Sequence, residues 1–157
     1  MVSAAPDGLV GGQALAAGDG LVWAAAAATV FGLDPTNLSV RKTGHLSSAV
    51  DDLWFGDGSV WASSKGYGAG VHRIDPATGS EVARVASDAI QIAFSPHGVW
   101  LSAAAGPTEI DPTTAAVLAT LPDSDVLGSD AAGIAVVDGE VWVDYKDSGQ
   151  LQRIKVP

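Results

Sequence analysis

The stretch Gly-Asp-Gly-Ser-Val-Trp at residues 56–61 decides the fold of this chain, because close copies of it occur three more times. The other copies end at Trp23, Trp100 and Trp142, so successive tryptophans are 38, 39 and 42 residues apart in the 157-residue chain. A spacing near 40 residues is typical of proteins built from one repeated unit. We therefore expect four copies of one small structural unit.

The residues around this stretch indicate that the unit is a set of four short antiparallel strands, here called A to D. Asp57-Gly58 supplies the positive φ values that a tight hairpin between strands A and B requires. Asp75-Pro76 begins a type I turn between strands C and D, because proline fits its second position and aspartate bonds its backbone. The strands are short apolar or alternating runs, at residues 53–55, 60–63, 71–74 and 81–85.

Four-stranded antiparallel units in tandem predict an all-β chain folded as a β-propeller, in which each unit is one blade. The alanine run 24–28 favours a helix by intrinsic propensity. It aligns with strand B of the other copies, however, so we expect a strand there. The blades are expected at approximately residues 13–46, 50–86, 89–122 and 131–157, the last completed by residues 1–6.

Two sets of repeated side chains are expected to be structural. The four tryptophans of the repeat are large side chains that a propeller buries between its blades. The repeated aspartates fall in turns, where a carboxylate bonds the backbone of its own turn. We therefore expect no binding role for Asp19, Asp57 and Asp138 in the A–B turns, or for Asp34, Asp75 and Asp111 in the C–D turns.

The composition excludes several classes of partner. The chain has 18 Asp and Glu against 8 Lys and Arg, a net charge of −10, so it would repel nucleic acid and acidic membrane surfaces. It has no cysteine, which excludes disulfides and thiolate metal sites. The longest apolar run, residues 21–31, is too short to span a bilayer, and residues 1–5 lack the features of a signal peptide. These observations alone predict no particular compartment.

The phrase from Gly-Asp-Gly-x-Val-Trp at residue 56 to Val-x-Arg-Ile-Asp-Pro-Ala-Thr-Gly-x-x-Val, which ends at residue 82, resembles the bacterial YVTN-type repeat. The same repeat is found in streptogramin-lyase-like propellers, and the resemblance covers essentially the whole chain. It implies a propeller in a bacterial periplasmic or extracellular location, in a family that includes binding proteins as well as enzymes. The lyase chemistry would need histidines and a glutamate around a magnesium ion. His45, His72 and His97 fall at three different places in the repeat, so no catalytic residue is carried over.

The last copy contains strands A to C, and a candidate for its fourth strand lies at the other end of the chain. Residues 2–11 resemble residues 118–128, which hold the end of a strand D and the link to the next blade. We expect this N-terminal segment to complete the last blade, since an unpaired strand edge invites aggregation. Within one chain it would close a four-bladed ring, and between two chains an eight-bladed ring with twofold symmetry. We favour the homodimer over a four-bladed ring or a piece of a larger propeller, because four flat blades of this size leave wide gaps.

Candidate binding residues lie in the parts of the chain that do not repeat. Propeller ligands generally meet the face that carries the B–C loops and the links between blades. Aromatic and charged side chains there could contact a small molecule or a protein, although exposed loops are polar in any case. The candidates are Lys65 and Tyr67 in one B–C loop, Tyr145 and Lys146 in another, and Asp125 and Asp130 in a link. The two aspartates could hold Ca²⁺ or Mg²⁺, but their spacing matches no calcium-loop motif, so we expect no cofactor.

Two functions are compatible with this sequence. It contains no Ser-His-Asp order, no phosphate-binding glycine loop followed by a helix, and no histidine-based metal motif. We therefore expect a non-catalytic scaffold or binding module that assembles with itself into a closed ring. The alternative is a metal-dependent enzyme of the lyase or hydrolase type, with its site at the mouth of the central channel.

Overall fold

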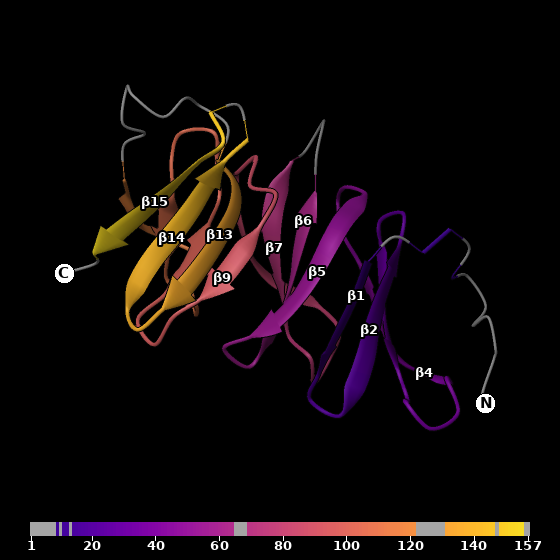
Figure 1. Ribbon diagram of the computed structural model, residues 1–157. Helices are drawn as coiled ribbons and strands as arrows, with labels where there is room; N and C mark the ends of the chain where they lie inside the picture. Colours follow the sequence, from indigo (N-terminus) through magenta and orange to yellow (C-terminus); the bar gives the residue numbers. More distant parts are fainter. Residues whose placement is uncertain are drawn as a thin grey trace. The chain divides into compact units, whose positions relative to one another are not determined.

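The structure is a computed structural model, and it describes residues 9, 11–12, 14–64, 69–121, 131–146 and 148–155. These residues form strands, turns and loops, and no helix occurs among them. The strands make four separate antiparallel sheets (Figure 1). The chain divides into two compact units, Met1–Ala86 and Ser87–Pro157, each with two of the sheets.

The first sheet shows how the alanine run folds. Its strands follow one another in chain order, and Ala24, Ala25 and Ala26 all lie within the second of them. The strand ends where Ala27 takes a positive φ of 48°, so the expected strand is confirmed in place of a helix. The sheet consists of β1 (Ala14–Gly18), β2 (Leu21–Ala26), β3 (Thr29–Leu33) and β4 (Val40–His45).

The second sheet has the same topology and contains the stretch that identified the repeat. The pair Asp57-Gly58 forms the tight turn between its first two strands, with positive φ values of 48° and 66°. The sheet consists of β5 (Val50–Gly56), β6 (Ser59–Ser64), β7 (Gly70–Ile74) and β8 (Glu81–Val85).

The second unit contains one four-stranded sheet and one sheet with three described strands. The former consists of β9 (Ile92–Phe94), β10 (Val99–Leu101), β11 (Thr108–Ile110) and β12 (Val117–Thr120). The latter consists of β13 (Ala131–Val137), β14 (Glu140–Tyr145) and β15 (Gln150–Lys155). Residues 1–6, the expected fourth strand of this sheet, lie outside the described residues.

Neighbouring sheets within each unit pack face to face through the repeated tryptophan. In the first unit Trp23 and Val30 share one core cluster with Leu53 and Ala62 of the next sheet. In the second unit Trp100 is clustered in the same way with Val141 and Val143 of the last sheet. Trp23, Trp61 and Trp100 are buried, as expected, whereas Trp142 remains partly exposed. Within each unit, the face of the first sheet that carries the tryptophan therefore packs on the face of the second sheet that does not carry one.

The repeated aspartates belong to turns, as the sequence predicts. Asp19, Asp57 and Asp138 have positive φ values, which aspartate tolerates better than most residues. The other set accepts hydrogen bonds from the backbone two residues further on: Asp34 from Thr36 at 2.8 Å, Asp75 from Ala77 at 2.9 Å, and Asp111 from Thr113 at 2.8 Å. These carboxylates hold the turns that connect the strands.

Candidate functional site

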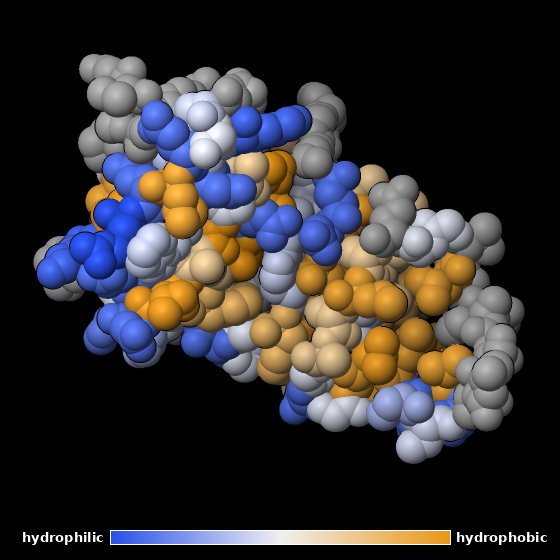
Figure 2. Space-filling model, in the orientation of Figure 1, coloured by the Kyte–Doolittle hydropathy of each residue, from blue (hydrophilic) through white to orange (hydrophobic). Residues whose placement is uncertain are grey.

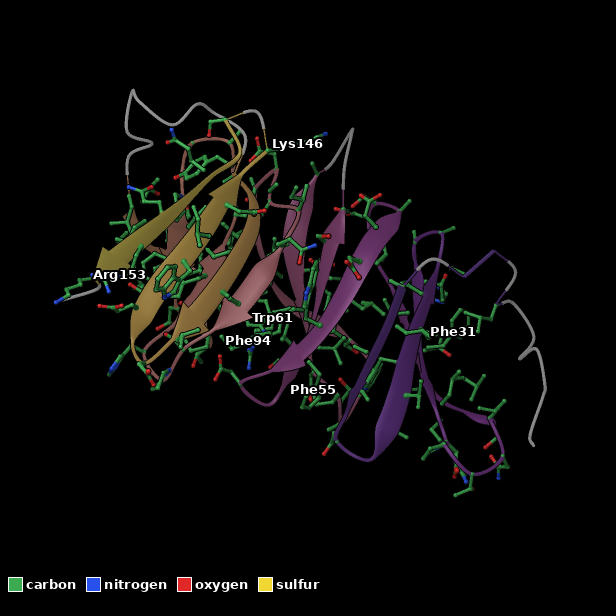
Figure 3. The ribbon with its side chains drawn as sticks, in the orientation of Figure 1. Phe31, Phe55, Trp61, Phe94, Lys146 and Arg153 are labelled. Atoms are coloured by element: carbon green, nitrogen blue, oxygen red, sulfur yellow. The ribbon has the colours of Figure 1, made fainter. Side chains whose placement is uncertain are left out.

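Of the six predicted binding residues, the structure describes Tyr145 and Lys146, which are neighbours at the end of β14. The Tyr145 side chain is buried in the core of the last sheet, and its hydroxyl donates a hydrogen bond to Gln152 Oε1 at 2.8 Å. Lys146 is exposed in the turn that follows (Figure 3). Tyr145 thus supports the base of this loop and Lys146 faces solvent.

The other four predicted residues are Lys65, Tyr67, Asp125 and Asp130, and all lie outside the described residues. Among the residues that the structure does describe, no three His, Asp or Glu side chains gather as metal ligands would. The described part of the chain also holds no helix long and apolar enough to cross a membrane.

A polar cluster around His72 in the second sheet was missed by sequence reasoning. His72 is fully buried in β7, and its Nε2 atom lies 3.0 Å from Ser64 Oγ and 3.3 Å from Ser48 Oγ. The Ser48 hydroxyl also donates to the Ser64 hydroxyl at 2.8 Å. On the other side of the imidazole, Nδ1 is 3.2 Å from Glu81 Oε1, a contact without hydrogen-bond geometry.

The order serine, histidine, carboxylate in this cluster is that of a hydrolase triad, but the burial of the cluster does not fit that role. A nucleophilic serine must reach a substrate, whereas both Ser64 and His72 have no exposed surface. A buried imidazole instead needs hydrogen-bond partners in order to be tolerated. The cluster is therefore a buried polar network that fixes β6 and β7 to the segment before β5.

Two turn aspartates, Asp34 and Asp57, have shifted pKa values. The Thr36 hydroxyl and the Arg41 guanidinium, the latter 2.8 Å from Asp34 Oδ2, hold the pKa of Asp34 well below its usual range. Partial burial has the opposite effect on Asp57 and raises its pKa. The effect on Asp34 comes from the hydrogen bonds that hold its turn to Thr36 and to Arg41.

Two apolar hollows lie on the described surface. One, of about 420 Å³, lies on the first sheet and is lined by Leu9, Gly12, Ala14, Leu15 and Ala24. Figure 2 shows apolar side chains gathered over β1 and β2. The other, of about 330 Å³, lies on the last sheet and is lined by Gly133, Ile134, Ala135, Trp142, Asp144 and Leu151. Arg153 is close to the second hollow, with its guanidinium 5.8 Å from the centre of the Trp142 ring.

The sequence matches no protein-family model and has no significant match among curated proteins. Solved structures do resemble it. The computationally designed Ika4 protein has a TM-score of 0.74 and 25% identity, over 93% of this chain and 91% of that one. The computationally designed Ika8 protein has a TM-score of 0.72 and 26% identity, over 90% of this chain and 45% of that one.

A natural protein, BamB from Moraxella catarrhalis, has the same fold at lower identity. Its TM-score is 0.73 and its identity 18%, over 90% of this chain and 49% of that one. This chain therefore spans slightly less than half the length of Ika8 and of BamB. The structural neighbours and the four sheets confirm the expected fold class, an all-β chain of β-propeller blades.

Proposed function

We propose that this chain is a non-catalytic β-propeller scaffold that closes its ring by pairing with a second copy of itself. The observation that supports the proposal is the outer edge of the last sheet, β13 to β15, which is unpaired in the described part of the chain. Among the described residues this sheet has three strands, and the outer edge of β15 has no partner strand. An open edge of this kind is a template for pairing with another strand.

The lengths of the structural neighbours support a two-chain ring. One copy of this chain covers 91% of the Ika4 chain but only 45% of the Ika8 chain. Two copies would therefore be needed to cover most of the Ika8 chain. A twofold arrangement is also the commonest form of homo-oligomer. We infer eight blades from two chains as the assembled form.

The strand that pairs with β15 is proposed to come from residues 2–6. Their sequence, Val-Ser-Ala-Ala-Pro, resembles Leu-Ala-Thr-Leu-Pro at residues 118–122, which begins within the fourth strand of the third sheet. The repeat type supports the same assignment, since YVTN and streptogramin-lyase-like propellers are built from blades of this kind. The function of such a ring is to present its loops to a protein or a small molecule.

Hydrogen exchange of β15 tests the pairing. The full chain is compared with a chain that lacks residues 1–6, and the amides of β15 that do not bond to β14 are followed by mass spectrometry or NMR. Pairing predicts slow exchange in the full chain and fast exchange in the shortened chain, while β6 serves as the internal control. Equal exchange of β15 in the two chains would show that residues 1–6 do not supply the strand.

A further inference from the structure

The first and last sheets each leave uncovered one half of the contact that joins neighbouring blades. In the complete contact between the first and second sheets, Trp23 and Val30 form one half, and Leu53 and Ala62 are part of the other. Val30 is 0% exposed there and Leu53 is 3% exposed. These values define what a covered blade contact looks like in this protein.

The tryptophan half of this contact is uncovered on the last sheet. Trp142 is the repeat equivalent of Trp23. Leu151 is the repeat equivalent of Val30, because Leu151 pairs with Asp144 and Val30 pairs with Ala25, each two residues after the tryptophan of its sheet. Leu151 is 64% exposed, against 0% for Val30, and Trp142 is partly exposed where Trp23 is buried. The hollow of about 330 Å³ marks this open half.

The receiving half is uncovered on the first sheet. Leu15 is the repeat equivalent of Leu53, because each pairs with the alanine that follows its tryptophan, Ala24 and Ala62 respectively. Leu15 is 70% exposed, against 3% for Leu53. The hollow of about 420 Å³ lies directly beside it and is lined mainly by apolar residues.

We propose that these two open halves bind each other between two copies of the chain, the Trp142 face of one copy packing on the Leu15 face of the other. The occupant is a second copy because each face already has its complement in this sequence, in the blade contacts within each unit. Two such contacts, related by a twofold axis, close a ring of two chains. This inference rests on the proposed function and assigns the two surfaces through which the chains bind each other.

Three charged groups lie near Trp142, and one of them, the exposed Asp144, lines the hollow and pairs in register with Leu151. Arg153 pairs in register with Trp142, and Glu140 lies 3.6 Å from Arg153 Nε. In the second sheet an arginine, Arg73, stands in the same register opposite Trp61, and Trp61 is nevertheless fully buried. Arg153 would therefore lie at the rim of the contact with its charge in water, as long basic side chains generally do.

Charge substitutions on the two faces test the assignment. Leu15→Glu and Leu151→Glu each place a carboxylate at the centre of one half, and both sites are exposed in the single chain, so the fold of the chain is expected to survive. The matched control is Leu118→Glu, because Leu118 is also exposed, at 55%, but lies on β12 of the third sheet, which carries neither of the two faces. Masses are measured by light scattering over a dilution series, and circular dichroism checks the fold.

We expect Leu15→Glu and Leu151→Glu to weaken dimerisation at least tenfold, and Leu118→Glu to leave it unchanged. If the unmodified chain dimerises and both face variants dimerise equally well, the surfaces are wrongly assigned while the proposed two-chain scaffold stands. If the unmodified chain is itself a monomer, the proposed function fails first, and this inference fails with it.

Discussion

At the scale of single residues, polar side chains have two structural roles: three aspartates hold turns, and His72 holds a buried network with Ser48 and Ser64. The residues next to Asp34, Asp75 and Asp111 predict that these aspartates lie in turns, and the structure confirms it. The contacts of His72 come from Ser64 and Ser48, which are 8 and 24 residues away in sequence. One signal in the sequence could have indicated this network: His72 occupies the position in strand C where the first sheet has the apolar Phe31.

The buried network around His72 gives the first prediction. His72→Phe should lower the free energy of unfolding by about 1–3 kcal/mol, since the hydroxyls of Ser48 and Ser64 lose a buried partner. Urea unfolding measures the change. His45→Phe is the control, because His45 is exposed in β4, and its effect should stay within about 0.5 kcal/mol. Equal stability of the His72 variant and the unmodified chain would mean that the network contributes nothing.

The turn at Asp34 gives a prediction on pH. Its pKa is lowered in the folded chain, chiefly by the Thr36 hydroxyl and then by Arg41, so the unfolded chain takes up the proton first as pH falls. The stabilisation from this turn is therefore complete above the ordinary carboxyl pKa of about 3.9 and is lost progressively below it.

An NMR titration of the side-chain carboxyl carbon measures this directly. We expect Asp34 to titrate clearly below the ordinary value, and to return toward it in the Arg41→Ala, Thr36→Ala double variant, which removes both hydrogen-bonding side chains. A normal titration of Asp34 in the unmodified chain would refute the role given to its two partners.

At the scale of elements, the strands and their tight turns followed from the repeat, while close approaches between sheets did not. Alignment with the other copies placed Ala24–Ala26 in a strand against their helix propensity, and β2 confirms it. Nothing in the sequence indicated that Gly44 of β4 meets the turn at Gly79. A Cβ added to Gly44 would overlap the Gly79 carbonyl oxygen, so the two sheets meet at this glycine because no side chain intervenes.

The contact at Gly44 gives a prediction at this scale. Gly44→Ala should destabilise the chain by about 1–3 kcal/mol, because the obstacle is backbone and the turn after β7 must shift. Gly12→Ala is the matched control, since the nearest atoms to an added Cβ there lie 3.6 Å away, an ordinary contact distance. Thermal and urea unfolding of the two variants should differ clearly, and identical curves would show that the sheets adjust without cost.

At the scale of the whole molecule, the tryptophan period was enough to predict a propeller, and the structural neighbours confirm that fold. The open surfaces could not be predicted, because Leu15 and Leu53, or Leu151 and Val30, look alike in the sequence. Their difference lies in what covers them, which is a property of neighbouring sheets. The proposed role as a scaffold rests on these two exposed faces, Leu15 on the first sheet and Leu151 on the last.

The central claim is that two chains make one closed ring, and the mass of the unmodified chain in solution tests it most directly. Sedimentation equilibrium over a range of concentrations should give a species of twice the 15.8 kDa chain mass, with no larger species as concentration rises, because a closed ring has no free face. A mass of 15.8 kDa at every concentration, or a mass that grows without limit, would contradict the account.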